Sequence, residues 1–376
     1  MDTSKNALDQ FAINLVNFVI RFRWLVLLVV ISAAITIATN ASKLEFANNY
    51  RVFFSAENPE LQAFESFQDT YVKNDNLLFV IEPADGEVFT NETLAVVYEL
   101  TGEAWQIPFS SRVDSITNFQ HTYAMEDDLI VEDLISDPGR MSQAELQRRK
   151  EIALAEPLLR DQLLTRNASV TAINITLQYP EIELDEVPNT VAYARDLRDR
   201  FEEQYPEIDI HLSGVSMLNN AFSEAGLSDA ATLVPTMFLV VLVMTALTLR
   251  SVSATLSVLV VIILSISTAM GMAQLIGLKL TPPAISAIVI ILTLAVADSI
   301  HILMTMRTSM RAGMPKREAL VEAVRVNFLA VAITSLTTAI GFAALNFSDS
   351  PPFRDLGNIS AMGIITAWFL SVTVLI

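Results

Sequence analysis

The stretch that decides the fold is Thr281-Pro-Pro-Ala-Ile-Ser-Ala-Ile-Val-Ile-Ile-Leu-Thr-Leu-Ala-Val-Ala-Asp298-Ser-Ile-His301-Ile-Leu-Met-Thr305. It is mostly apolar and is longer than the roughly 20 residues that a helix needs to cross a bilayer. Asp298 and His301 are its only ionisable residues. A carboxylate inside hydrocarbon costs about 2.5–3.5 kcal/mol on insertion scales, and such residues often serve in proton relays. We therefore predict a membrane-spanning helix with a functional acid inside it.

Similar apolar runs elsewhere predict an α-helical polytopic membrane protein with six transmembrane helices. The predicted spans are residues 24–40, 229–250, 251–278, 281–306, 326–348 and 355–376. The last span stops within its apolar run, so we expect the chain to be the N-terminal part of a longer protein. The first span also has features of a signal peptide, although no clean cleavage site of small residues follows it.

The charge is divided unevenly along the chain. Residues 42–226 hold 34 acidic and 13 basic residues, a net charge of −21, whereas the whole chain has −18. This division predicts an acidic soluble domain at residues 41–228 and a membrane part with basic loops. Nucleic acid is not an expected partner of an acidic surface. The chain has no cysteine, which excludes disulfides and thiolate metal sites.

The basic residues predict the orientation in the membrane. They gather in residues 1–23, at Arg250 and in residues 307–325, and the positive-inside rule assigns these segments to the cytoplasm. The domain at 41–228 is then extracytoplasmic, which means periplasmic for a protein of a bacterial inner membrane. We expect residues 307–325 to form a cytoplasmic loop with an amphipathic helix that starts near Pro315 and lies on the membrane surface.

The acidic domain is predicted to be α+β. Strands are expected at residues 77–82, 113–119, 170–179 and 208–213, and helices at 91–104 and 189–204. An acidic, partly helical insert occupies about 121–166. The order βαβ, insert, βαβ suggests a ferredoxin-like unit. The acidic cluster at 126–133 lacks the spacing of a calcium-binding loop, so we expect a solvated surface and no metal.

Polar residues on two predicted helices are candidates for a proton relay. Asp298 and His301 share a helix face because they are three residues apart. Thr334, Thr337 and Thr338 share a face of the fifth span, and hydroxyls can bond either protonation state of an acid. We predict that these five residues form the relay, and that protonation of Asp298 shifts its hydrogen bonds to Thr334 or Thr338. The alternative is that each threonine only bonds its own helix backbone.

Three segments resemble the resistance–nodulation–division (RND) superfamily. Ala295-Val-Ala-Asp298-Ser-Ile-His301 is similar to its acidic motif. Residues 332–345 and 351–363 resemble the fifth helix and the start of the sixth in its MMPL-type and sterol-sensing-domain members. One helix, a large external domain and five more helices look like the N-terminal half of such a transporter. Ala297 stands where many members have a second carboxylate, which leaves Asp298 alone.

The resemblance implies export of hydrophobic or amphiphilic, lipid-like molecules driven by the proton-motive force, with a porter-type external domain. Its implied partners are the lipid-like substrate, the membrane, a second six-helix half and further copies in a homo-oligomer. Two alternatives have the same architecture: a lipid sensor without net transport, and an accessory subunit of protein translocation. We expect no enzyme and no cofactor, because the sequence offers no pairing of a nucleophile with a base.

Overall fold

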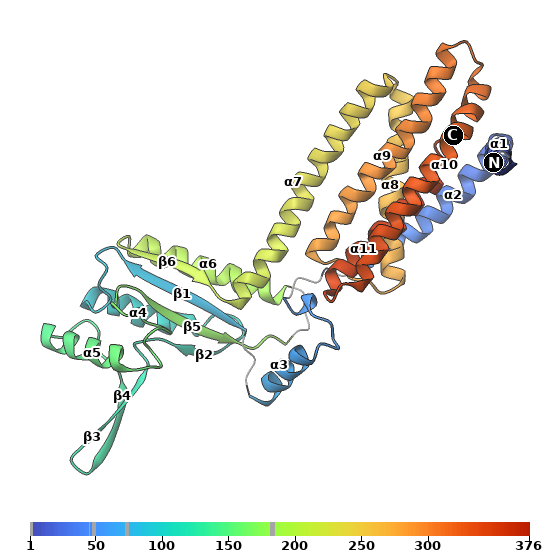
Figure 1. The fold of residues 1–376 in the computed structure, drawn as a ribbon. Helices are drawn as coiled ribbons and strands as arrows, with labels where there is room; N and C mark the ends of the chain where they lie inside the picture. Colours follow the sequence, from blue (N-terminus) through green and yellow to red (C-terminus); the bar gives the residue numbers. More distant parts are fainter. Residues whose placement is uncertain (1–2, 45, 47–49, 72–74, 181–184) are drawn as a thin grey trace. The chain divides into compact units, whose positions relative to one another are not determined.

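The computed structural model describes residues 3–44, 46, 50–71, 75–180 and 185–376. Contacts divide the chain into two compact units (Figure 1): the bundle unit, Met1–Leu61 with Ser223–Ile376, and the sheet unit, Gln62–Phe222. Parts of two predicted segments fall outside the described residues. These are residues 1 and 2 of the predicted N-terminus 1–23, and residues 45, 47–49, 72–74 and 181–184 of the predicted domain 41–228.

Within the described residues, five helices are long and apolar enough to cross a membrane. They are α2 (Arg23–Ala38, extended to Lys43 by the 3-10 turn η1, Thr39–Lys43), α7 (Val215–Leu249), α8 (Val252–Leu275), α9 (Pro282–Arg311) and α10 (Lys316–Ala343, extended by η3, Ala344–Phe347). A polytopic membrane protein is therefore confirmed. The sixth predicted span is the helix α11 (Pro351–Ser371), which is not among the five. Arg354, Asp355 and Asn358 make its first turns polar.

Two helix boundaries differ from those predicted. The span predicted at 229–250 is the last part of α7, which already begins at Val215. The loop predicted at 307–325 is only a short turn, because α9 continues to Arg311 and α10 begins at Lys316. The expected amphipathic helix is thus the first part of α10. Hydropathy marks the hydrocarbon-spanning part of a helix, whereas a helix continues wherever its backbone is bonded and no residue breaks it.

The helices α8, α9, α10 and α11 pack against one another, and α2 packs against α8. Small residues bring these helices close together. A Cβ atom built on Gly271 of α8 would lie 2.0 Å from the carbonyl oxygen of Ile37 in α2, and one on Gly363 of α11 would lie 2.2 Å from Cδ1 of Ile291 in α9. The fully buried residues of α9 and α10 include several alanines: Ala284, Ala287, Ala295, Ala319 and Ala323.

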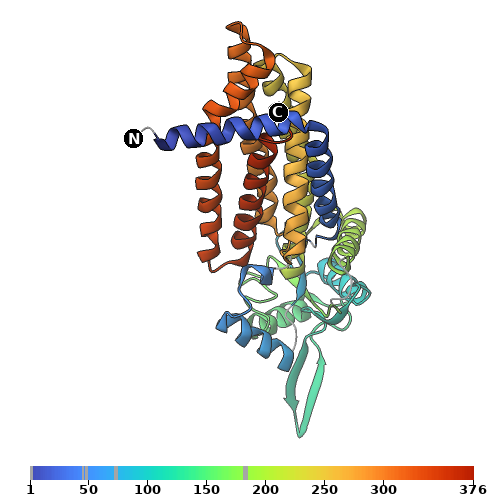
Figure 2. The same cartoon turned by 90° about the vertical axis from the view of Figure 1, so that its right-hand side faces the viewer.

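A further helix, α1 (Thr3–Arg21), lies across the bundle and packs on α10 (Figure 2). Its buried residues are Ala12, Val16 and Val19. Arg325 of α10 bonds Asp9 of α1 at 2.8 Å and Glu322 of its own helix at 2.7 Å. The sequence interpretation of residues 1–23 missed this helix, although the spacing of its apolar residues is typical of an amphipathic helix.

The sheet unit contains a four-stranded antiparallel sheet in the order β2-β5-β1-β6. Its strands are β1 (Asn76–Pro83), β2 (Ser110–Asp114), β5 (Thr171–Leu177) and β6 (Ile208–Ser213). Helix α4 (Asn91–Ala104) connects β1 to β2, and α6 (Glu186–Gln204) connects β5 to β6. The predicted strands and helices are found in this order, with β2 a few residues earlier than the predicted 113–119. The core of the unit is built on Leu77, Phe79, Ile81, Ile173 and Ile175.

The insert between β2 and β5 contains a hairpin that the sequence did not predict. Its strands are β3 (Gln120–Met125) and β4 (Asp128–Asp133), followed by α5 (Gln143–Ala155). Glu126 in the hairpin turn has φ +56°. The acidic cluster lies on the turn and on β4. Neither strand of this hairpin has a buried residue, so no alternation of buried and exposed apolar residues marks it. Two further elements precede β1: η2 (Tyr50–Phe53) and α3 (Pro59–Thr70).

Candidate functional site

Asp298 lies inside the helix bundle. Its side chain is only 3% exposed, and it occupies the buried face of α9 together with Ile291, Ala295 and Ile302. This face packs against α8, α10 and α11. The structure therefore places the acid among neighbouring helices, as a functional acid in a membrane requires.

The hydrogen-bond partner of Asp298 is Ser335 of α10. Ser335 Oγ donates to Asp298 Oδ2 at 2.9 Å, and both side chains are buried. Among the described residues, no other side chain is found to donate to Asp298. Ser335 lies on the buried face of α10 between Val331 and Ala339, at steps of four residues. One hydrogen bond thus joins α9 to α10 at the depth of the acid.

The predicted partner hydroxyls do not reach Asp298. Thr334, Thr337 and Thr338 donate to backbone carbonyls of their own helix at 2.7–3.1 Å. Thr334 and Thr337 are exposed on the outside of the helix. Ser335 follows Thr334 directly, and a single residue turns an α-helix by about 100°, so the bonded hydroxyl lies on the face next to the threonines. The predicted role of the threonines in a relay stays a prediction.

His301 lies at the edge of the buried face. Its side chain is exposed, whereas Asp298 before it and Ile302 after it are buried. No hydrogen bond or ion pair joins His301 to Asp298 in the part of the chain that the structure describes. The predicted role of His301 therefore stays a prediction.

Sequence analysis missed two further polar features of the bundle. The first is a bridge from α10 to α9, in which Asn327 Nδ2 donates to Thr305 Oγ1 at 2.8 Å, toward the basic end of both helices. The second is a set of hydroxyls that are buried without a hydrogen-bond partner among the described residues: Thr268 of α8, Ser299 of α9 and Ser360 of α11. Ser299 follows Asp298 directly in the sequence, and this position was the signal for a further hydroxyl near the acid.

Ala297 is the position at which the resemblance leads one to expect a second carboxylate. Its side chain is exposed on α9, next to the buried Asp298. A carboxylate at this position would point away from Ser335 because consecutive helix residues differ by about 100°. Of the two positions, 298 is therefore the one that faces the packed interior of the bundle, and it carries the acid.

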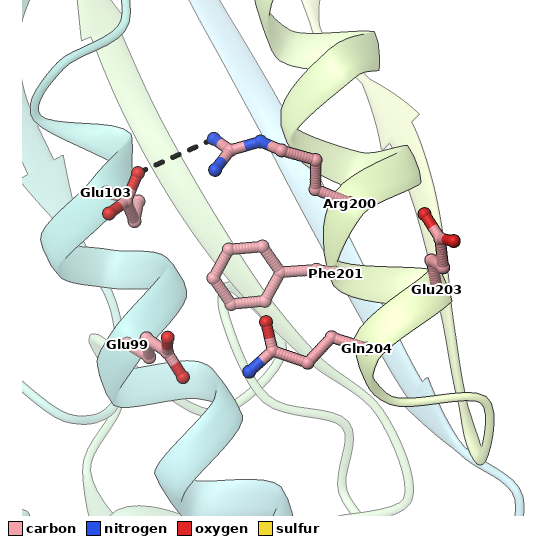
Figure 3. Close-up of a pocket in the computed structure, with 6 residues that line it drawn as sticks. All are labelled: Glu99, Glu103, Arg200, Phe201, Glu203 and Gln204. Atoms are coloured by element: carbon pink, nitrogen blue, oxygen red, sulfur yellow. Dashed lines mark ion pairs between the residues drawn. The ribbon is translucent and has the colours of Figure 1, made fainter.

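The sheet unit has a polar pocket of about 340 Å³ between α4 and α6 (Figure 3). Arg200 points toward Glu103, with 3.5 Å between Nη2 and Oε2. Glu99 lines the same pocket and accepts a hydrogen bond from Tyr205 at 2.7 Å. This bond raises the pKa of Tyr205. The pocket's charged lining does not match a hydrophobic ligand.

The comparison with known families gives one result. The model of the MMPL family matches residues 63–375, which is most of the chain. The match covers nearly all of the sheet unit and of the segment Ser223–Ile376 of the bundle unit. No curated protein matches the chain.

Proposed function

We propose, from the premise that this chain belongs to the MMPL family, that it uses the proton-motive force to export lipid-like molecules. The family itself points to transport of lipid-like substrates by an RND-type transporter. The proton coupling, the direction of transport and the residues that carry the proton are our proposal.

The observation that carries the proposal is the hydrogen bond from Ser335 to Asp298 between two packed helices. An ionised carboxylate only accepts hydrogen bonds, whereas a protonated one also donates. Protonation of Asp298 would therefore replace a charge-assisted bond by a weaker neutral one. Each protonation state favours its own packing of α9 against α10, and a proton gradient shifts the balance between the two.

The polar groups toward the basic end of α9 extend the proposed relay. His301 lies one turn beyond Asp298, and the bridge between Asn327 and Thr305 lies one turn farther. An imidazole can both accept and donate a proton, so His301 is suited to pass a proton on. We propose that protons move between Asp298 and that end of the bundle along this line.

The orientation and the identity of the sheet unit are also part of the proposal. Arg250 lies in the turn between α7 and α8, Arg307 and Arg311 lie near the end of α9, and Lys316 begins α10. The positive-inside rule assigns this end of the helices to the cytoplasm. The N-terminus then lies in the cytoplasm and the sheet unit in the periplasm of a bacterial inner membrane. The strand order β2-β5-β1-β6, with α4 and α6 as crossovers, supports a ferredoxin-like, porter-type domain.

Proton flux in proteoliposomes tests the proposal. The full-length protein is reconstituted under an imposed pH gradient as wild type, as Asp298→Asn and as Asp349→Asn, the last being a control acid in the exposed turn before α11. We expect flux in the wild type and the control and none in Asp298→Asn. Equal flux in all three, or flux in none, would contradict proton coupling and favour the lipid-sensor alternative.

A second pair of variants tests the partner of the acid. Ser335→Ala removes the hydroxyl that bonds Asp298 in the described part of the chain, and Thr334→Ala removes its neighbour, which bonds its own backbone. We expect Ser335→Ala to lower flux much more than Thr334→Ala does. The reverse order would show that the threonine face predicted from the sequence is the functional one.

A further inference from the structure

A second feature of the bundle unit lies far from Asp298, at the basic end of its helices. It is a pocket of about 520 Å³. Three cations from three different elements line it: Arg250 from the turn between α7 and α8, Arg307 from α9, and Lys316 from the start of α10. No acidic side chain lines it.

These three cations have no acidic partner among the described residues. Two other basic residues at the same end do have partners: Arg325 pairs with Asp9 and Glu322, and Arg317 donates to Asn17. Like charges around one cavity repel one another. An anion in the pocket would remove this repulsion, so the charge pattern indicates an anionic ligand.

The polar side of the pocket also offers hydroxyl groups. Ser251, Ser253 and Ser257 line it at the start of α8, and Ser251 Oγ lies 3.2 Å from Ser253 Oγ. The first turn of a helix presents free backbone N–H groups that favour an anion. Together with the three cations, these groups form a polar surface with the chemistry that binds phosphate.

The other side of the pocket is apolar. Leu303, Met306 and Met310 of α9 and Leu320 of α10 line it. A free phosphate ion gains no binding energy from apolar side chains, whereas a phospholipid has acyl chains that can contact them as well as a phosphate. The pocket also lies where membrane-spanning helices end, at the depth of lipid headgroups.

We infer that this pocket binds the headgroup of an anionic phospholipid. Its phosphate would bond Arg250, Arg307 and Lys316, and its acyl chains would follow the apolar wall of α9. Basic pockets between transmembrane helices bind anionic headgroups in this way. The inference goes beyond the proposed function, because the site holds a resident lipid whether or not the protein transports one.

Native mass spectrometry of the full-length protein tests the inference. The purified protein is titrated in detergent with dioleoylphosphatidylglycerol, with the zwitterionic dioleoylphosphatidylcholine and with inorganic phosphate. We expect the anionic lipid to bind at least tenfold more tightly than the zwitterionic one. The variant Arg307→Gln should weaken the first bound anionic lipid about fivefold, and Arg250→Gln with Arg307→Gln and Lys316→Gln on the order of a hundredfold.

A matched variant separates the pocket from bulk charge. Arg21→Gln with Arg23→Gln and Arg311→Gln removes the same charge from the same end of the bundle but outside the pocket, and it should bind the lipid as the wild type does. An equal loss in both triple variants, or equal affinity for the two lipids, would overturn the inference. Phosphate that binds as tightly as the anionic lipid would overturn the lipid assignment. If the pocket triple does not fold, Arg250→Gln and Lys316→Gln each carry the test.

Discussion

The sheet unit and the bundle unit fill their interiors with different side chains. The sheet unit buries a phenylalanine, Phe79, and many leucines and isoleucines completely, such as Leu100. Fully buried residues of the bundle's α9 and α11 are often small, such as Ala295, Ser299 and Ser360. In water, burial of apolar area stabilises a core by about 25 cal/mol per Å². In a bilayer that force is missing between helices, so close contact and hydrogen bonds decide the packing.

This difference explains how the bundle unit can hold an acid, Asp298, in its interior. Asp298 lies where small residues let the helices approach, and the approach brings Ser335 to 2.9 Å from its carboxylate. In the sheet unit the hydrophobic core cluster is filled largely by leucine, isoleucine and phenylalanine, whose side chains form no hydrogen bonds. The two interiors should therefore respond differently to the same kinds of substitution.

The largest effect is expected from removing a large side chain in the sheet unit. Phe79→Ala deletes a ring that is fully buried in β1, and such a change costs about 3–5 kcal/mol. Hydrogen exchange of the full-length protein should show loss of protection in β1 and β5, with the bundle helices unchanged. An equal loss of protection in α8 and α9 would mean that the two interiors do not behave as separate cores.

A medium effect is expected from enlarging a small residue in the bundle. Gly271→Ala places a methyl group against the backbone of α2 at Ile37, and overpacking of this kind costs about 1–3 kcal/mol. Gly341→Ala is the matched control, because a Cβ at Gly341 meets no atom within 4 Å. Thermal unfolding in detergent should show a lower midpoint for Gly271→Ala only. The same midpoint for both variants would contradict close packing as the main stabilising contact.

The smallest effect is expected from removing one buried hydrogen bond in the sheet unit. Tyr179 donates to Ser216 at 3.1 Å, and Tyr179→Phe should cost about 0.5–1.5 kcal/mol. Burial also raises the pKa of Tyr179. The folded state thus favours the neutral phenol of Tyr179. The contribution of this preference to the free energy of unfolding is complete below the ordinary pKa of about 10, and it is lost as the pH rises through the pKa of the folded state. Chemical denaturation between pH 8 and 11 should show a smaller loss in Tyr179→Phe than in the wild type, because Tyr205, whose pKa is also raised, is present in both proteins.

The sheet unit was the easier part to predict from the sequence. Its strands β1 and β5 alternate in burial, and α4 begins after Thr90, whose hydroxyl accepts the N–H of Thr93 as expected for a cap. The hairpin of β3 and β4 was not predicted because neither strand has a buried side that hydropathy can mark.

The bundle could be predicted only to the level of its spans and its acid. Asp298 stands out in any hydropathy reading, but its partner depends on how α10 is rotated about its axis. Residues 334–338 offer hydroxyls on several faces, so the hydroxyls alone do not fix that rotation. The useful signal was that small or branched residues lie four or eight positions apart along α10 and mark its packed face. They are Ala319, Ala323, Val331 and Ala339, and Ser335 lies on the same face.

The contact between α1 and α10 provides a practical route to watching this protein work. Asp9 and Arg325 hold the two helices together at 2.8 Å, so a shift of α10 would displace α1 as well. The sequence has no cysteine, and Asn14 lies on the exposed face of α1. A single cysteine at that position would accept one fluorescent or spin label in an otherwise unmodified protein, and its signal would report the movement of α10 in real time.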